Sequence, residues 1–181
     1  LLANNAVPVY GPDSANIPQV SHHLYEGDSI TLAGTAFNVL EIPGHTIDHI
    51  AFTASPAGEN PLVFCGDTLF TAGCGRIFEG SAEQMYQSLQ KLAALPDATR
   101  IYCAHEYTLS NLAFATAVEP TSQALHNKTA EDEKKREQGL PTVPSTLAIE
   151  RETNPFLRCH LSTLALAASQ HSARELSDPV E

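Results

Sequence analysis

The spacing of apolar residues changes near residue 108, and this change limits the possible folds more than any other feature of the chain. Before it, short β-rich runs alternate with turn residues, at 7–10, 29–32, 37–42, 49–54, 62–65 and 100–103. After it, the spacing is helical, at 109–118, 122–138 and 161–168. A β-rich part followed by a helical part predicts an α/β (α+β) protein of two packed units, residues 1–108 and 109–181.

One helix is expected inside the β-rich part. Ser81 is a suitable N-cap, and Gln84 stands three residues later as its capping-box partner. Leu89 and Leu92 continue at helical spacing, and Pro96 ends the segment. In the second part, the charged run 131–137 is interpreted as the solvated face of a helix.

Composition excludes several classes of partner. Ten basic and twenty-one acidic residues give a net charge of -11, so the long-range field repels nucleic acid and anionic lipid. No apolar run approaches the roughly eighteen residues of a membrane span. We therefore expect neither nucleic acid nor membrane as a partner, and an anionic ligand needs a local basic group.

The cysteines indicate a reducing compartment. Cys65, Cys74, Cys103 and Cys159 are widely spaced and form no C-x-x-C pair, which is typical of reduced thiols in the cytoplasm. Cys74 and Cys103 are interpreted as buried thiols and not as nucleophiles. We expect a cytoplasmic monomer.

Potential metal ligands follow three of the predicted strands. His45 stands in a Pro-Gly-His-Thr segment with His49 four residues on, Asp67 follows the run 62–65, and His105 follows the run 100–103. Imidazole and carboxylate suit zinc or iron, and a carboxylate can bridge two cations because it has two oxygens. A single histidine after a strand is more often structural, so the specificity comes from the three segments together. Asp67 is the natural bridge between His45 and His105.

These segments resemble glyoxalase II, the hydroxyacylglutathione hydrolase family of the metallo-β-lactamase superfamily. The resemblance covers nearly the whole chain. It implies an αββα sandwich followed by a small all-helical substrate-binding domain, with a two-metal site at the edge of the sandwich. The segments that carry it are residues 43–46, 64–70, 73–76, 78–80, 104–108 and 141–147.

The resemblance also implies a reaction. His45 would bind the first of two divalent metal ions, His105 the second and Asp67 both, with zinc as the expected metal and iron or manganese as alternatives. Asp67 would hold a bridging hydroxide that attacks S-(2-hydroxyacyl)glutathione thioesters such as S-D-lactoylglutathione. The products are glutathione and D-lactate, as in methylglyoxal detoxification. His49 is interpreted as a support behind the ligands.

Three further residues would bind glutathione by the same resemblance. Arg76 supplies a guanidinium for a carboxylate, in a loop whose glycines let the backbone approach a ligand closely. Tyr107 contributes a phenolic hydrogen bond. Phe78 stands where some members of the family have tyrosine, so one hydrogen bond to glutathione is expected to be missing.

A family segment of the form H-x-H-x-D-H, which supplies most metal ligands, is expected upstream of residue 7 and is not among the 181 residues. A basic stretch at the C-terminal end of relatives is not among them either. The chain therefore reads as glyoxalase II with its front end missing. Taken alone, it is expected to bind metal weakly and turn over little, because two protein ligands per ion fall short of the usual three.

The sequence is also compatible with two other functions. One keeps the fold and changes the reaction to oxidation of glutathione persulfide by a mononuclear iron enzyme. The other is a metal-deficient fragment that acts as a binding module. The helical continuation of the chain, together with the Thr-Val-Pro-Ser segment at 142–145, favours the thioesterase.

Overall fold

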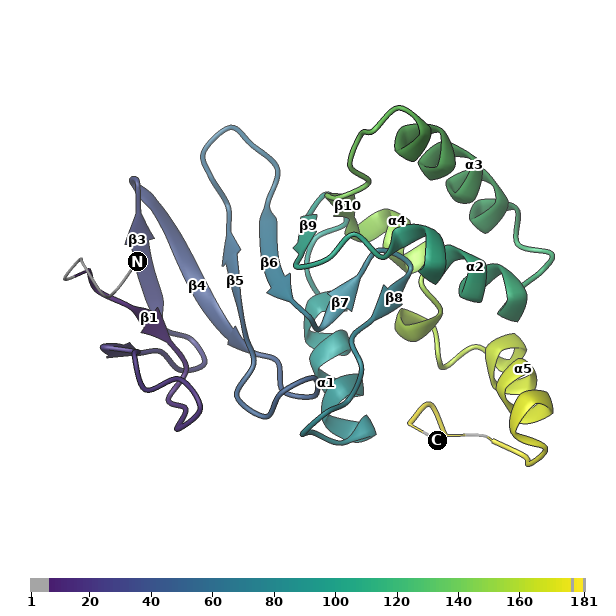
Figure 1. The fold of residues 1–181 in the computed structure, drawn as a ribbon, viewed down its shortest axis with the longest axis horizontal. Coiled ribbons are helices and arrows are strands. Elements are labelled where there is room, and N and C mark those ends of the chain that lie inside the picture. The colour runs from purple at the N-terminus through teal and green to yellow at the C-terminus, as the bar shows by residue number, and fades with distance from the viewer. Residues whose placement is uncertain (1–6, 177, 181) are drawn as a thin grey trace.

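A computed structural model describes residues 7–176 and 178–180. Its centre is a six-stranded sheet in the order β10-β9-β6-β5-β4-β3 (Figure 1). Neighbouring strands are antiparallel, except that β6 and β9 run parallel. The strands are β3 (Ser29–Leu32), β4 (Thr35–Glu41), β5 (Ile50–Ala54), β6 (Leu62–Gly66), β9 (Arg100–Cys103) and β10 (Ser145–Thr146). The mixed α/β architecture expected from the sequence is confirmed.

The first predicted strand is largely wrong. Of the run 7–10, only the last residue is in a strand, β1 (Tyr10–Gly11), which pairs in parallel with β2 (His22–His23) outside the main sheet. The proline at position 8 has no backbone N–H to donate, which limits how far this segment can pair.

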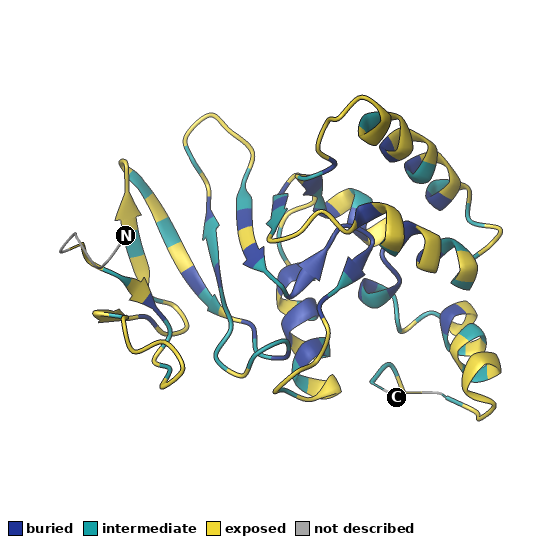
Figure 2. Ribbon diagram, viewed as in Figure 1, coloured by how far each residue is buried: buried dark blue, intermediate teal, exposed yellow. Residues whose placement is uncertain are grey.

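Helix α1 (Ala82–Ala93) covers one face of the sheet, and Figure 2 shows buried residues concentrated where the two meet. The helix begins as expected, because the Ser81 side chain accepts from the Gln84 N–H and the Gln84 side chain accepts from the Ser81 N–H. Its apolar stripe packs on the inward side chains of β5, β6 and β9. The core cluster includes Ala51, Val63, Cys65, Met85, Leu89, Leu92 and Ile101.

The opposite face of the sheet carries a row of aromatic side chains. Phe64 lies opposite Phe52 on β5 and Tyr102 on β9, and its ring contacts Tyr102 and Phe37 at centroid distances of 5.1 and 6.2 Å. Phe64 is 44% exposed and the other three are half-buried. The two faces of the same strands are therefore unequally covered.

A short hairpin follows β6. It consists of β7 (Leu69–Phe70) and β8 (Gly73–Cys74), which pair antiparallel around a two-residue turn. Ala72 in that turn has a left-handed backbone, with φ at 55°. A non-glycine residue in this region is disfavoured by about 1–2 kcal/mol, so surrounding contacts must hold the turn.

The C-terminal part contains α2 (Thr108–Val118), α3 (Gln123–Glu137), α4 (Leu147–Thr153), the 3-10 turn η2 (Pro155–Leu157) and α5 (Ser162–Ser172). It is not purely helical, because β10 adds an edge strand to the main sheet, and Leu147 and Leu157 belong to the sheet's core. The division at residue 108 stays a prediction. In the described part of the chain, no helix combines the length and hydropathy that crossing a bilayer requires.

The charged run on α3 is not wholly solvated, contrary to expectation. Asp132 is fully buried and lies 2.5 Å from the Lys128 ammonium nitrogen, which is also buried. Glu131 and Lys135 form an ion pair at the same distance of 2.5 Å on the more exposed side of the helix. Charge alone could not reveal which acidic residue of the run faces the neighbouring helices.

Candidate functional site

The three predicted ligands meet at one edge of the sheet because of the strand directions. β4 is antiparallel to β5 and β5 to β6, so β4 and β6 point the same way, and β9 is parallel to β6. The carboxyl ends of all three strands therefore lie at the same edge. His45, Asp67 and His105 each follow one of these strands within four residues.

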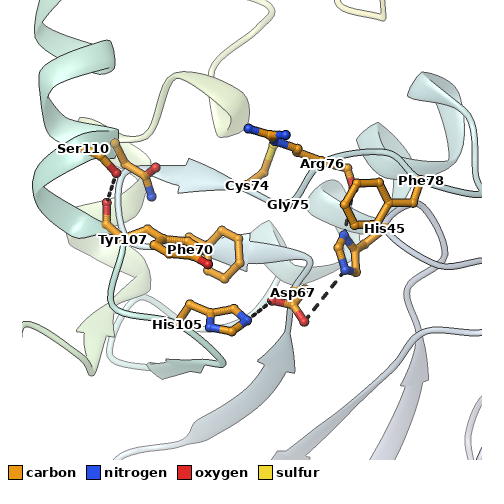
Figure 3. A pocket seen from close by; sticks show the side chains of 11 residues that line it. His45, Asp67, Phe70, Cys74, Gly75, Arg76, Phe78, His105, Tyr107 and Ser110 are labelled. Carbon is orange, nitrogen blue, oxygen red and sulfur yellow. Dashed lines mark hydrogen bonds and ion pairs between the residues drawn. The ribbon is translucent and has the colours of Figure 1, made fainter.

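Asp67 stands between the two imidazoles (Figure 3). Its Oδ1 lies 3.2 Å from His105 Nε2, and its Oδ2 lies 3.9 Å from His45 Nε2. The His45 Nδ1 is 2.8 Å from the Arg76 carbonyl oxygen, which can only accept, so Nδ1 carries the proton. The Nε2 lone pair of His45 is thereby directed to the side where Asp67 lies.

His49 lies behind Asp67. Its Nε2 accepts a hydrogen bond from the Asp67 backbone N–H at 3.1 Å. Burial lowers the pKa of His49, which favours the neutral ring that can accept this bond. Gly66 makes the approach possible, because its φ is +53° and a Cβ there would collide with the His49 ring. His49 thus fixes the backbone of the central carboxylate.

A cavity of about 630 Å³ opens beside these groups. All three residues expected to bind glutathione, namely Arg76, Phe78 and Tyr107, line it. Figure 3 shows them around Asp67, with Tyr107 on the side of His105 and Phe78 on the side of His45. The full lining is His45, Asp67, Phe70, Cys74, Gly75, Arg76, Phe78, His105, Tyr107, Ser110 and Asn111.

Aromatic rings flank both imidazoles. The His105 ring stacks on Tyr107 with centroids 5.0 Å apart, and the His45 ring lies 4.8 Å from Phe78. Phe70 packs edge-on against Tyr107 at 5.5 Å. These contacts limit the rotation of the imidazoles and give the cavity apolar walls around a polar floor.

Two family models divide the chain between them. Residues 8–105 match the metallo-beta-lactamase superfamily, and residues 106–181 match the C-terminus of hydroxyacylglutathione hydrolase. The chain belongs to the hydroxyacylglutathione hydrolase family. The resemblance noted in the sequence is thereby confirmed, as is the metallo-β-lactamase fold class.

Relatives of this family match nearly the whole chain. A hydroxyacylglutathione hydrolase of Nitrosomonas europaea is 52% identical over 96% of this chain, and one of Nitrosomonas eutropha is 52% identical over 99%. The chain spans 65% and 69% of the lengths of these two proteins. Among solved structures, ETHE1 from Myxococcus xanthus matches with a TM-score of 0.60 at 25% identity, over 98% of this chain and 62% of that one.

The superfamily implies divalent metal ions, and the side chains present fit part of a two-metal site. Asp67 offers one oxygen toward each imidazole, and both imidazoles present Nε2 to it. Within the described residues, no cluster of three or more His, Cys, Asp or Glu side chains could hold an ion by itself. An ion placed between Asp67 and either imidazole would have only two of these side chains as ligands, fewer than the three protein ligands typical of a catalytic zinc site.

Burial favours the neutral thiol form of three cysteines near the cavity. Burial raises the pKa of Cys74 to about 12 and that of Cys65 to about 12, and it also raises the pKa of Cys103. The thiolate is the reactive form, so these groups stay neutral at physiological pH. Cys74 and Cys103 are only partly buried, so the prediction that both are buried thiols is not confirmed, and Cys74 borders the cavity.

Sequence reasoning missed Phe70, Ser110 and Asn111 as lining residues. Ser110 and Asn111 lie in the first turn of α2, directly after Tyr107, and the Asn111 N–H donates to the Tyr107 carbonyl at 3.0 Å. A helix that starts at a site residue places its first turn beside that site. This signal was available from the predicted helix at 109–118.

Proposed function

We propose that the protein carrying this chain hydrolyses S-(2-hydroxyacyl)glutathione thioesters, S-D-lactoylglutathione among them. Water adds to the thioester carbonyl, the carbon–sulfur bond breaks, and the products are the 2-hydroxy acid and glutathione. The observation that carries this proposal is the cavity that joins Asp67 and its two imidazoles to Arg76 and Tyr107. The relatives named hydroxyacylglutathione hydrolase support the same reaction.

His45, Asp67 and His105 would hold two divalent metal ions, for which we propose zinc, since imidazole and carboxylate ligands suit it. When bound, such ions supply Lewis acidity and a water molecule acidic enough to ionise near neutral pH. Asp67 would contact both ions, with one oxygen toward each imidazole, and the Arg76 carbonyl would keep His45 in the tautomer that can ligate.

The rest of the cavity would bind the glutathione part. In a chain of net charge -11, Arg76 brings an exposed guanidinium to the cavity, where it can pair with a glutathione carboxylate. The phenol of Tyr107 and the side chains of Ser110 and Asn111 add hydrogen-bonding groups on the opposite wall. Phe70, which is buried, and Phe78, which is exposed, add apolar surface to the cavity between these polar groups.

The alternative of a mononuclear iron enzyme acting on glutathione persulfide is less well supported. A carboxylate with a separate oxygen toward each of two imidazoles suits two ions better than one. The identity of 52% to hydroxyacylglutathione hydrolases is also about twice the 25% to the ETHE1 structure. The third alternative is a metal-deficient chain that binds a partner and catalyses no reaction.

The test is hydrolysis of S-D-lactoylglutathione by the complete protein and by residues 1–181 alone, with the metal content of each determined. We expect turnover with about two metal ions in the complete protein. We expect little metal and little turnover in the isolated 181 residues, because two ligands per ion are few. Full metal content without thioester cleavage would refute the proposal, and dioxygen consumption with glutathione persulfide would favour the alternative.

We also propose a cytoplasmic location and a monomeric state. The four cysteines are all free, which suits a reducing compartment. Cell fractionation and sedimentation of the complete protein would test the two proposals separately.

A further inference from the structure

The turn between β7 and β8 is held by side chains from far along the chain. The Ala72 N–H donates to Glu150 Oε2 at 2.8 Å. The Asn154 side-chain amide donates to the Phe70 carbonyl at 3.1 Å and to the Gly73 carbonyl at 2.9 Å. Glu150 lies on α4 and Asn154 is the C-cap of that helix, one turn later, and both are some eighty residues from the hairpin in sequence. In all three bonds the partner in the hairpin is a backbone group.

A third side chain completes the arrangement. Asn111 on α2 donates to the Thr71 carbonyl at 3.0 Å. Each of the four residues 70–73 therefore has a backbone group bonded to a side chain from another element. Since Ala72 is in the disfavoured left-handed region, the turn depends on these bonds to keep its conformation.

Glu150 and Asn154 form a satisfied polar network in a fully buried place. Both are 0% exposed, the Asn154 amide nitrogen also lies within hydrogen-bond distance of Glu150 Oε2, at 3.1 Å, and Ser145 Oγ lies 2.5 Å from Glu150 Oε1. Burial raises the pKa of Glu150, so keeping a carboxyl here has a cost. Apolar side chains would fill the same space more cheaply, and they could not bind the backbone of the turn.

The turn matters because of what the hairpin carries. Phe70, the last residue of β7, packs against the rings of His105 and Tyr107, with centroids 6.1 and 5.5 Å away. Cys74, at its end, leads into Gly75 and Arg76 on the cavity wall. A shift of the turn would therefore move both the apolar wall and the guanidinium that faces the ligand.

We propose that Glu150 and Asn154 are positioning residues for glutathione binding. They hold the β7–β8 hairpin in the conformation that gives the cavity its wall, and they do so without contacting the ligand. This proposal rests on the proposed function, because it assigns that wall to the glutathione part of the substrate.

The test compares Glu150→Leu with Glu150→Gln in the complete protein. Glutamine can keep all three bonds, with its oxygen accepting from Ala72 and Asn154 and its amide donating to Ser145, whereas leucine keeps none. The probe is S-hexylglutathione, a thioether that cannot be hydrolysed, titrated by calorimetry into metal-free protein. We expect Glu150→Leu to weaken its binding about tenfold, since small misplacement of a binding group has effects of this order or more. Glu150→Gln should bind as the unaltered protein does.

Two more variants separate positioning from general stability. Asn154→Ser keeps a hydroxyl that can cap η2 but is too short to reach the hairpin carbonyls, so it should also weaken binding. Glu152→Leu makes the same change as Glu150→Leu at an exposed position of α4 and should leave binding unaltered. Hydrogen exchange at the Ala72 amide should speed up in Glu150→Leu and stay slow in Glu150→Gln.

The outcomes are distinct. Unaltered binding in folded Glu150→Leu and Asn154→Ser would overturn the proposal, and so would loss of folding in both, which would make the network a folding requirement only. In turnover of S-D-lactoylglutathione, a raised KM at nearly constant kcat supports positioning, whereas a lower kcat at constant KM indicates fewer folded molecules and contradicts it. If the unaltered protein binds S-hexylglutathione but cleaves no thioester, the proposed function fails while the positioning role stands.

Discussion

The edge of the main sheet and the face that packs on α1 are built from the same strands, but their side chains differ in exposure to water. At the edge, the side chains of His45, Asp67 and His105 are 18%, 26% and 49% exposed. On the face toward α1, Val63 and Ile101 are 1% and 2% exposed. Water reaches the first group and is excluded from the second.

Because of this difference, a single strand carries core residues that stabilise the fold and is followed by a residue of the candidate site. β6 places Val63 in the core and is followed by Asp67 one residue beyond its end. β9 places Ile101 in the core and is followed by His105 two residues beyond its end. Changes at the edge should therefore alter activity and leave folding nearly intact, and changes on the face should do the reverse. Glu150 is the test of this rule, because it is buried like a core residue and acts on the cavity.

The largest effect is expected at the edge. Asp67→Asn removes the charge between the two imidazoles and should lower kcat of the complete protein about 10³-fold, since the metal ions contribute several kcal/mol. The free energy of unfolding of the metal-free protein should change by less than about 0.5 kcal/mol, as for other partly exposed sites. Thioester turnover, metal analysis and urea unfolding measure the three quantities. Activity near that of the unaltered protein would remove Asp67 from its assigned role.

On the α1 face we expect a large effect on stability and none on turnover. Leu92 belongs to the core cluster and is 1% exposed, so Leu92→Ala leaves a cavity there and should lower the free energy of unfolding by about 3 kcal/mol. Turnover per folded molecule should not change. Leu166→Ala is the matched control, because Leu166 is 60% exposed and its loss should cost little. A large fall in kcat per folded Leu92→Ala molecule would contradict the separation.

Glu150 should give stability a dependence on pH. Burial raises its pKa in the folded state above the ordinary value of 4.5. Below pH 4.5 the carboxyl is protonated in both states, so its contribution is complete. As pH rises from there through the folded-state pKa, the unfolded chain loses the proton more readily, and that stability is lost. Unfolding free energies at several pH values should therefore show Glu150→Gln gaining on the unaltered protein as pH increases. An equal dependence in both proteins would be evidence against this assignment.

The edge could be predicted from the sequence because its signals are local. A polar residue directly after a β-rich run lies at a strand end, and strands β3 and β9 begin and end where their apolar patterns do. The α1 capping box is local too, since Ser81 and Gln84 are three residues apart. The predicted ligands therefore came together in space, although their roles as ligands stay predictions.

The hairpin and its supports could not be predicted in the same way. β7, β8 and β10 have two residues each, too few to show a period. Ala72 adopts a left-handed backbone that its residue type does not signal. Nothing in the local sequence indicates that Glu150 bonds to Ala72, because the two residues are 78 positions apart in the chain. Contacts between distant segments determine these features.

The smallest expected effect is a gain at the edge. Phe78 is 69% exposed and its ring already packs on His45, so a hydroxyl added in Phe78→Tyr is solvated and should leave stability unchanged. A phenol at this place in the cavity can donate to glutathione, and one hydrogen bond of about 0.5–1.5 kcal/mol corresponds to a KM lowered about 2- to 10-fold.

Phe114→Tyr makes the same change on an exposed ring that does not line the cavity and should leave KM as it is. Because kcat should stay constant in both variants, steady-state kinetics with S-D-lactoylglutathione decides the matter. A KM that does not fall in Phe78→Tyr would mean that this part of the edge shapes the cavity without contacting glutathione.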